Sequence, residues 1–380
     1  MKEKRKREAI EVVERLPHVL VEDILQRLEI KPIVRFTCVS KQWNSTIKSR
    51  YFASRHLARV KSPNPDILLG GELVHESKPY PCLRTLGSHS GSLTDVNYIA
   101  KPSRRRLVVT GSCDGLVCIY DFKKVLYVFN PATRWCRFLP RAKIQKINCV
   151  RENLNCNSAR AFLGFGKDTL TSNYKMVWLY NSFENLDGQT TCEVFDFATN
   201  TWRYVIGSRH RICDHDFKSH PVYTDGSLYW WTPQLNNKET KMICFDLHAE
   251  VFQRMEIPID YVGPHRIIMC SLNNRLCVSA MKINGIQDMW SLKSDKVWEK
   301  THSLDLSYTT FGEYSGVPLS LVAIFDKTRM LILWQSLEEK VLLLVEDTET
   351  QSGKHKVRSI SPWFNKPSSW LVNLLIELVH

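Results

Sequence analysis

The sequence lacks the features that mark membrane-spanning and secreted proteins. No apolar run reaches the roughly 18–20 residues that a membrane-spanning helix needs. The chain begins "MKEKRKRE", and no apolar segment follows, which argues against a secretory signal peptide. These absences predict an intracellular protein, nuclear and/or cytoplasmic, with no membrane partner.

The sequence also lacks any C-x-x-C pair, because its twelve cysteines are scattered singly along 380 residues. Several lie in apolar runs such as "GLVCIY" and "KMICFD", where a reduced cysteine packs as a small hydrophobic side chain. A disulfide framework is therefore not expected. The densest group of metal-ligand residue types, "RHRICDHDFKSH" (209–220), has a spacing that fits no standard zinc site. We expect a polar loop there, and no metal or cofactor in the chain.

A concentrated positive charge, as in a DNA-binding domain, is not evident despite the net charge of +13. Residues 1–60 hold 14 Lys/Arg and 7 Asp/Glu, whereas the other 320 residues hold 38 and 32. The larger part is thus weakly basic, and no nucleic-acid partner is expected. The tip "KEKRKR" fits either a nuclear-import signal or a solvated basic tail. We assign residues 1–13 to a flexible basic tail.

Residues 14–60 carry helical periodicity. Pro17 stands where a helix can start, because its missing N–H costs nothing there. One apolar stripe follows at i, i+3, i+4 and i+7, formed by Val21, Ile24, Leu25 and Leu28. Pro32 offers a second helix start, and a second stripe comprises Phe36, Val39, Trp43 and Ile47. A third short helix is predicted in "SRYFASRHLARV" (49–60).

This helical module is near the lower size limit for burying an independent core. It therefore needs a surface to pack against. The pattern fits equally well with packing on the rest of the chain and with packing on another protein.

From about residue 100 onward, short β runs replace the helical period. Residues 107–139 read "LVVT", "LVCIY", "VLYVF" and "WCRFL", joined by turns rich in Gly, Asp, Asn, Pro and Lys. This pattern predicts a four-stranded antiparallel meander. Similar units recur around residues 176–206, 227–257, 275–304 and 330–360.

The spacing of these units favours a propeller. Their third strands align at Phe129, Phe195, Phe245, Trp290 and Val345, at intervals of 45–66 residues. Periods near 40–50 are typical of propeller blades, the kelch class above all. A large β-sandwich is the alternative. We assign residues 101–360 to the propeller-like domain, residues 61–100 to a linker or a degenerate first blade, and residues 361–380 to a C-terminal segment. Residues 370–380 fit a short helix or a closing strand.

Two stretches carry a family resemblance. Leu16-Pro17, "VEDILQRL", "KPIVRFTCVSKQW" and the following "YF" resemble an F-box, over residues 14 to about 55. The stretches "CDGLVC", "FNPATR" and "CEVFDFATNTWR" resemble the F-box-associated domain of plant F-box proteins. The fold class is therefore mainly β, with a three-helix F-box followed by a kelch-like β-propeller of about six blades.

The resemblance implies a non-catalytic substrate-recognition subunit of an SCF-type (Skp-cullin-F-box) ubiquitin ligase. The F-box would dock on a Skp-type adaptor, and through it on the cullin and RING subunits. The β domain would bind a target protein for ubiquitination and degradation. Two alternatives are a scaffold that delivers no target for degradation and a propeller enzyme, which would need titratable residues clustered at the centre of the ring.

By match to the motif, the adaptor-binding residues are Leu16, Pro17, Ile24, Leu25, Leu28, Val39 and Trp43. Each also suits the core of the helical module, Val39 most of all, whereas Leu16 and Trp43 are the best candidates for interface anchors. The target-binding residues are unassigned.

The candidate target-binding segments are a loop insertion at 141–160 and the loops at 181–190, 207–220 and 232–240. "GFG" (164–166) lacks the rest of a phosphate-binding loop and is expected to be a turn. The pair Trp230-Trp231 fits either a recognition surface or the core between blades.

Overall fold

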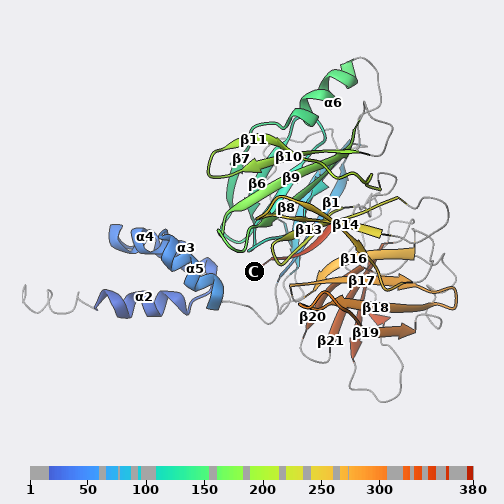
Figure 1. Ribbon diagram of the computed structural model, residues 1–380. Coiled ribbons are helices and arrows are strands. Elements are labelled where there is room, and N and C mark those ends of the chain that lie inside the picture. The colour runs from blue at the N-terminus through green and yellow to red at the C-terminus, as the bar shows by residue number, and fades with distance from the viewer. Residues whose placement is uncertain are drawn as a thin grey trace, which may run out of the picture.

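A helical head and a β body make up the chain (Figure 1). The computed structural model describes residues 17–59, 66–75, 78–86, 93–95, 108–153, 161–182, 189–213, 220–233, 241–259, 266–272, 274–305, 320–325, 329–335, 341–347, 357–358 and 375–379. Leu16 and the basic tail lie outside this range, so the predictions made for them stay predictions. In the described part of the chain, no helix is both long and apolar enough to cross a membrane.

The head consists of four short helices: α2 (His18–Gln26), α3 (Ile30–Phe36), α4 (Lys41–Ile47) and α5 (Arg50–Arg59). Helices α2 and α5 match the first and third predicted helices, and α2 begins directly after Pro17. The second predicted stripe is divided between α3 and α4 at Ser40, whose backbone is extended and whose side chain accepts the N–H of Trp43 at 3.1 Å. A serine in this position satisfies a backbone donor at a helix start, so a new helix begins there.

The described strands form six four-stranded antiparallel sheets, numbered here as blades 1 to 6 along the chain. Blade 1 contains β24 (Leu375–Val379), β1 (Asp66–His75), β2 (Lys78–Leu86) and β3 (Leu93–Asp95). Blade 2 contains β4 (Val108–Val109), β5 (Val117–Tyr120), β6 (Leu126–Asn130) and β7 (Trp135–Phe138). Blade 3 contains β8 (Ala161–Lys167), β9 (Tyr174–Asn181), β10 (Thr190–Asp196) and β11 (Thr201–Val205).

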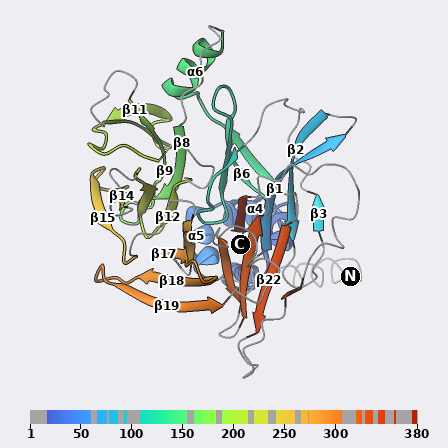
Figure 2. The ribbon, with the colours of Figure 1, turned by 90° about the vertical axis from the view of Figure 1, so that its right-hand side faces the viewer.

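The remaining three blades have the same design, and the six sheets are arranged in a ring (Figure 2). Blade 4 contains β12 (Val222–Thr224), β13 (Ser227–Trp231), β14 (Lys241–Asp246) and β15 (Phe252–Glu256). Blade 5 contains β16 (Ile267–Leu272), β17 (Arg275–Met281), β18 (Ile286–Leu292) and β19 (Trp298–Asp305). Blade 6 contains β20 (Ser320–Phe325), β21 (Arg329–Gln335), β22 (Val341–Asp347) and β23 (Val357–Arg358). The six-bladed prediction is confirmed.

The ends of the β body meet in blade 1. β24 pairs antiparallel with β1, with Ile67 opposite Leu378 and Leu69 opposite Ile376. Residues 375–379 therefore form a closing strand, and the prediction of a helix there is wrong. Closure of this kind pairs the sheet edge that would otherwise offer unpaired N–H and C=O groups.

The core lies between neighbouring blades. Trp178 of β9 packs edge-on against Tyr120 of blade 2, with ring centroids 4.9 Å apart, while its neighbour Val177 packs with Leu228 and Trp230 of blade 4. Successive residues of a strand point to opposite faces, so each blade contributes to two cores. Trp231 faces the next interface along, with Met269 of blade 5. The pair Trp230-Trp231 is thus core between blades, and a β-sandwich is excluded by this radial packing.

A recurring turn joins the third and fourth strands of blades 2, 3 and 4. It begins with Asn130, Asp196 or Asp246, whose side chains accept backbone N–H groups two or three residues later. The fifth residue, Arg134, Asn200 or Glu250, has a φ of 63°, 58° or 57°. Asn and Asp stabilise such turns with their own side chains, which explains why "NPATR" and "DFATN" recur in the sequence.

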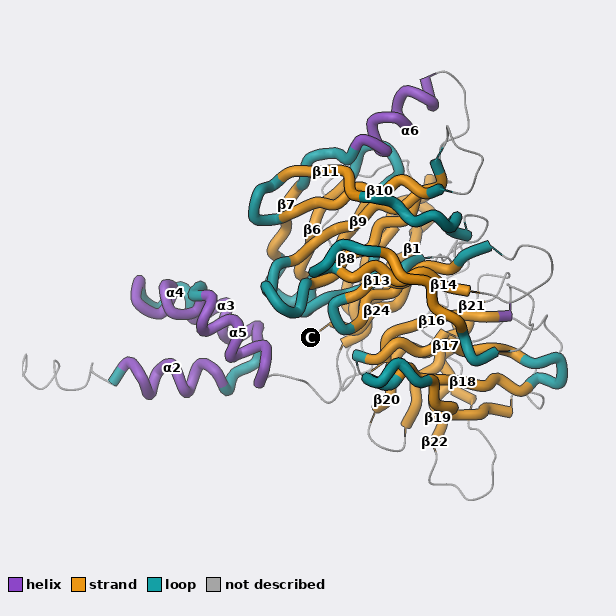
Figure 3. The backbone as a smooth tube through the Cα atoms, in the orientation of Figure 1, coloured by secondary structure: helices purple, strands orange, loops and turns teal. Residues whose placement is uncertain are grey.

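Two predictions about connecting segments are wrong. Gly164 and Gly166 are not in a turn but in β8. A Cβ on either residue would lie within 2.7 Å of Leu228 or Tyr223 of blade 4. Glycine is what allows the blades to approach this closely. The segment 141–160 is not only a loop, since it contains α6 (Lys143–Asn153) (Figure 3).

Candidate interaction surfaces

The head has a small core of its own. Val21, Leu25, Ile33 and Phe52 are buried, and they are surrounded by the partly buried side chains of Leu28, Phe36, Trp43 and Ile47. The buried ring of His56 connects α5 to the end of α2, because its Nε2 lies 2.8 Å from the carbonyl oxygen of Leu28. The helices thus pack on each other, and none of them shares an extensive contact with a described strand.

The head also exposes several large apolar side chains, and this set of residues is called here the outer face. It consists of Val19, Leu20, Ile24, Val34, Val39 and Tyr51. These are six of the fifteen large apolar side chains exposed in the described part of the chain, although the head is the smaller part of it. Scattered exposed apolar residues are ordinary, but a concentration of them marks an interaction surface.

The two faces of α2 carry different apolar stripes. Val21 and Leu25 of α2, and Leu28 just after its end, pack in or against the core of the head, whereas Leu20 and Ile24 are about half exposed. The predicted single stripe is therefore wrong in one member, since Ile24 belongs to the outer face. An apolar surface on both sides of a helix requires a second partner beyond the helix's own core.

The predicted adaptor-binding residues fall into two groups. Pro17, Ile24 and Val39 are exposed, with Ile24 at 51% and Val39 at 57%. Leu25, at 1% exposed, is core, and Leu28 and Trp43 are half-buried against it. The prediction that Val39 is the member best suited to the core is wrong, because it lies in the turn after α3 and not on a helix face. Trp43 packs edge-on against Phe36 with ring centroids 5.7 Å apart, so it supports the core as well.

The two ends of the ring differ in their connections. In an antiparallel meander, the links between first and second and between third and fourth strands share one end, called here the short-turn end. The links between second and third strands and between blades share the other, the long-connection end. All four segments predicted to bind a target, 141–160, 181–190, 207–220 and 232–240, are at the long-connection end. The parts at 154–160, 183–188, 214–219 and 234–240 lie outside the described residues.

The head is joined to the ring at the opposite, short-turn end. β1 is the second strand of blade 1, so it begins at the short-turn end, and β24 finishes there. Six residues separate α5 from β1, and an extended chain of that length spans at most about 20 Å. In Figure 2 the long-connection end faces the viewer and the head lies behind the ring. The long connections are thus on the side of the ring away from the head.

Helix α6 is the largest described feature of the long-connection end, and buried groups hold it in place. The carboxylate of Glu193 in β10, 2% exposed, accepts the N–H groups of Lys143 and Ile144 at 2.8 and 2.9 Å and the hydroxyl of Tyr180 at 3.0 Å. A carboxylate at a helix N-terminus satisfies free donors and interacts favourably with the helix dipole. Glu193 lies 50 residues further along the chain than Lys143, so no local motif in the sequence predicts this contact.

The turn between β5 and β6 of blade 2, called here the blade 2 turn, supplies the second anchor of α6. Gln145 Nε2 donates to the carbonyl oxygens of Asp121 and Val125, at 3.0 Å each, and Asn148 Nδ2 donates to Phe122 at 3.1 Å. Gln145 and Asn148 are fully buried. The helix therefore bridges blades 2 and 3 as a fixed part of the ring.

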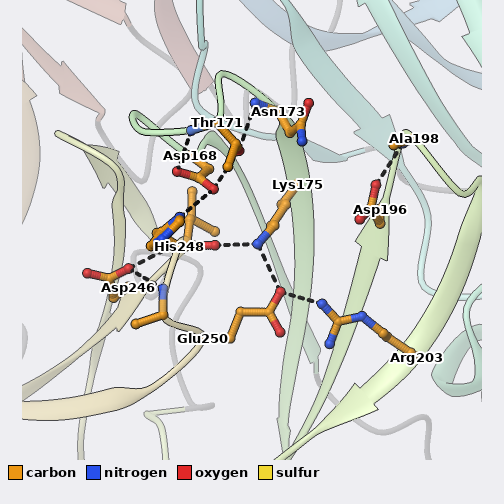
Figure 4. Close-up of polar contacts among 12 residues, drawn as sticks. Asp168, Thr171, Asn173, Lys175, Asp196, Ala198, Arg203, Asp246, His248 and Glu250 are labelled. Carbon is orange, nitrogen blue, oxygen red and sulfur yellow. Dashed lines mark hydrogen bonds and ion pairs between the residues drawn. The ribbon is translucent and has the colours of Figure 1, made fainter.

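A polar network joins blades 3 and 4 at the short-turn end (Figure 4). The carboxylate of Glu250 forms ion pairs with Arg203 and, at 2.9 Å, with the ammonium of Lys175. Lys175 also donates a hydrogen bond to the carbonyl oxygen of Leu247 at 2.5 Å. His248 Nδ1 lies 3.1 Å from Asp168 Oδ2, and Thr171 donates its hydroxyl to the same carboxylate oxygen at 2.6 Å. No sequence pattern indicates this network, because its members come from four separate strands or turns.

The network fixes the charge of its carboxylates. Burial alone would raise the pKa of Asp168, but hydrogen bonds from Thr171 and His248 outweigh it and hold that pKa well below its usual range. Burial likewise opposes ionisation of Glu250, and the hydrogen bonds from Arg203 and Lys175 lower its pKa. Each charged group is paired across the blade boundary, so the arrangement serves to hold the turn of blade 4 against blade 3.

Comparison with known families agrees with this two-part architecture. Residues 13–55 match the F-box domain, and residues 92–363 match the F-box associated beta propeller domain. The chain belongs to the F-box proteins that carry an F-box-associated β-propeller. The head of this F-box protein is thus the F-box, and its β body is the associated propeller.

Several proteins of Arabidopsis thaliana are similar to this F-box protein over most of their length. An F-box/LRR-repeat/kelch-repeat protein is 40% identical over 359 residues, covering 90% of this chain and 92% of the relative. An F-box protein is 37% identical over 400 residues, covering 95% and 98%. Another is 44% identical over 289 residues, covering 73% and 87%. The Dos1 propeller matches with a TM-score of 0.38 at 12% identity, over 74% of this chain and 65% of that chain, which carries no functional argument.

The segment 209–220, rich in metal-ligand residue types and predicted to be a polar loop, lies partly outside the described residues. His210, Cys213 and His220 are described, whereas residues 214–219 are not. Within the described part of the chain, no three His, Cys, Asp or Glu side chains come together as a metal site would require.

Proposed function

We propose that this F-box protein is the substrate-recognition subunit of an SCF-type ubiquitin ligase. Its head docks on a Skp-type adaptor, and through it on the cullin and RING subunits. Its propeller binds a target protein, which is then ubiquitinated and degraded. The chain contributes no chemistry of its own: holding a target beside the conjugating enzyme raises the effective concentration of the target's lysines.

The observation that carries this proposal is the outer face of the head. Leu20, Ile24 and Val39 are exposed although the head already has a closed core, so they do not serve its folding. The head makes no extensive contact with described strands that would cover them. An adaptor surface that buries this face supplies the missing partner, at about 25 cal/mol per Å2 of apolar area removed from water.

The division of the ring into two ends supports the second half of the proposal. The head is joined at the short-turn end, whereas the candidate target-binding segments are at the long-connection end. A bound adaptor and a bound target therefore occupy opposite sides of the propeller and do not compete.

The test is affinity purification of the tagged full-length chain from plant cells, with the double variant Ile24→Asp, Val39→Asp. Both residues are exposed, so the variant keeps its core and is expected to lose the adaptor and the cullin together. The control is Ile283→Asp, Val297→Asp, which makes the same changes at exposed propeller residues and is expected to keep both. Retention of the adaptor by the head variant would refute the docking face.

The alternative is a scaffold that binds the adaptor without delivering a target for degradation. It is separated by measuring the abundance of propeller-bound proteins in cells that carry the head variant. A receptor predicts that at least one of them accumulates, and a scaffold predicts that none does.

A further inference from the structure

The positive charge of the β body is concentrated in one part of the chain. Residues 121–160 contain nine Lys/Arg and two Asp/Glu, a net charge of +7. The whole of residues 61–380 holds 38 and 32, so the remainder holds 29 and 30 and is close to neutral. The weakly basic character expected for the whole body is thus a property of a single segment.

The fold gathers most of these cations at the long-connection end. Two lie in the turn between β5 and β6, and four lie on or beside α6, which packs on that turn through Gln145 and Asn148. We call this group the basic patch, and it consists of Lys123, Lys124, Arg141, Lys143, Lys146 and Arg151. Lys124, Arg141, Lys143 and Lys146 are exposed.

Two acidic groups close to the basic patch, Asp121 and Glu193, are turned inward. Asp121, 3% exposed, accepts the backbone N–H groups of the turn that carries Lys123 and Lys124. Glu193 is buried beneath the first turn of α6. Within the part of the chain that the structure describes, Lys124, Arg141, Lys143 and Lys146 form no ion pair. These four exposed cations therefore repel one another, and within the described residues no ion pair neutralises any of them.

The basic patch lies on a helix and a turn that buried hydrogen bonds hold in place, and exposed apolar side chains lie near it. The ammonium of Lys143 lies 5.3 Å from the ring centroid of Tyr204 in β11, and Tyr204, Val150 and Ile206 are exposed. A free basic tail would be solvated and mobile, whereas α6 is fixed by buried side chains at both blades. Fixed cations with adjacent apolar side chains suit a protein surface that combines carboxylates with apolar groups.

We propose that the basic patch is a docking site for an acidic segment, rich in Asp and Glu, of the target protein. This inference rests on the proposed function, because it assigns the kind of target feature that the propeller recognises. Charge complementarity selects the partner: four exposed cations of the patch form no ion pair among the described residues, and at physiological ionic strength the field of the patch extends over about 8 Å. Such a site accelerates and orients the encounter with an acidic segment, and its local charge pairs add to the binding strength.

The experiment measures fluorescence anisotropy of a labelled peptide of alternating Glu and Gly residues with the full-length chain. The patch variant is Arg141→Glu, Lys143→Glu, Lys146→Glu, and the control variant is Arg254→Glu, Arg275→Glu, Lys296→Glu. The control changes the net charge by the same amount, at exposed residues outside the patch. We expect the patch variant to bind the peptide at least about tenfold more weakly than the wild type, and the control to stay within about twofold, because the interaction is local.

The remaining arms separate the outcomes. Thermal unfolding identifies a variant that fails to fold, in which case Arg141→Gln, Lys143→Gln, Lys146→Gln replaces it. The same peptide with Gln in place of Glu is expected not to bind. Equal weakening in both variants, wild-type binding by the patch variant, or tighter binding of an oligouridylate of equal charge would each overturn the proposal.

Adaptor binding distinguishes this inference from the proposed function. The patch variant is expected to retain the Skp-type adaptor, because the patch is on the side of the ring away from the head. A chain that binds the adaptor but not the acidic peptide contradicts only the docking site. A chain that binds the peptide but not the adaptor contradicts only the ligase role.

Discussion

The indole N–H of Trp202 in blade 3 donates to the carbonyl oxygen of Pro140 in blade 2, at 2.7 Å. The same contact recurs two blades on, where Trp298 donates to Glu256 at 3.0 Å. Pro140 directly precedes the segment that carries α6, so this bond fixes where the segment leaves the ring. A tryptophan at or near the start of the fourth strand thus links two blades by a hydrogen bond and also packs against their core.

Trp202→Phe removes this bond and retains most of the ring's packing. We expect the free energy of unfolding to fall by about 1 kcal/mol, the usual net contribution of one hydrogen bond. The measurement is denaturant unfolding. The control is Trp135→Phe, the equivalent change in the preceding blade, where the side chain is 48% exposed. An equal loss in both variants would show that ring size, and not the hydrogen bond, matters.

Glu193→Gln tests the anchor of α6. The amide keeps one acceptor oxygen and loses the charge, so a buried donor at the start of α6 loses its partner. We expect a loss of about 1–3 kcal/mol, together with faster amide exchange in the first turn of α6. Glu256→Gln, at an exposed residue, serves as the control. Unchanged exchange in α6 would contradict the anchoring role.

Leu25→Ala and Ile24→Ala distinguish the two faces of α2. Leu25 is fully buried, so its truncation is expected to destabilise the head by about 2–5 kcal/mol. Ile24 is half exposed, so its truncation is expected to change stability by less than about 0.5 kcal/mol. The same truncation is expected to weaken binding to the adaptor. Amide exchange across residues 18–59 of the full chain reports stability, and titration with purified adaptor reports binding. Similar losses of stability in the two variants would contradict the assignment of faces.

Asp288 makes the stability of blade 5 depend on pH. Its buried carboxylate receives Lys282 and Lys300 at 2.7 Å each and the hydroxyl of Ser303 at 2.6 Å. Burial opposes ionisation, but these partners outweigh it and lower the pKa to about 2. An unfolded Asp has a pKa of about 3.9, so as pH falls the unfolded chain binds the proton first.

The stabilisation from Asp288 is therefore complete above about pH 5 and is lost as pH falls from about 4 to 2. Asp288→Asn is expected to lower stability at neutral pH and to flatten the pH dependence of unfolding within that window. Urea unfolding at a series of pH values measures both effects. The exposed Asp295→Asn is the control, and a slope in Asp288→Asn equal to that of the wild type would refute the assignment.

Much of the fold could be read from local patterns. The strands of blades 2 to 6 follow the apolar runs and turn residues, and the "NPATR" and "DFATN" turns have the side-chain caps that their first residues suggest. The helices of the head follow their apolar stripes, except at Ser40, where a capping serine divides the second one. Local signals of this kind depend on a few neighbouring residues, which is why they survive in the sequence.

Local sequence patterns gave wrong predictions where contacts with a neighbouring blade determine the secondary structure. "GFG" has the composition of a turn, but it lies in a strand, and Gly164 and Gly166 are glycines because Leu228 and Tyr223 occupy the space that side chains would need. The polar composition of 141–160 suggested a loop, but Glu193 and the blade 2 turn support a helix there. No window along the chain contains these partners.

The sequence by itself determined the two-part design, a helical head before a ring of four-stranded units, because periodicity and turn chemistry act within single elements. Only the tertiary structure decided which apolar residues face outward and which cations share a surface. Ile24 and Leu25 are neighbours in the chain, yet only Leu25 lies in the core. Lys124 and Lys146 belong to one patch because α6 packs on the blade 2 turn. Both outcomes depend on long-range packing, which brings together residues that no local pattern relates.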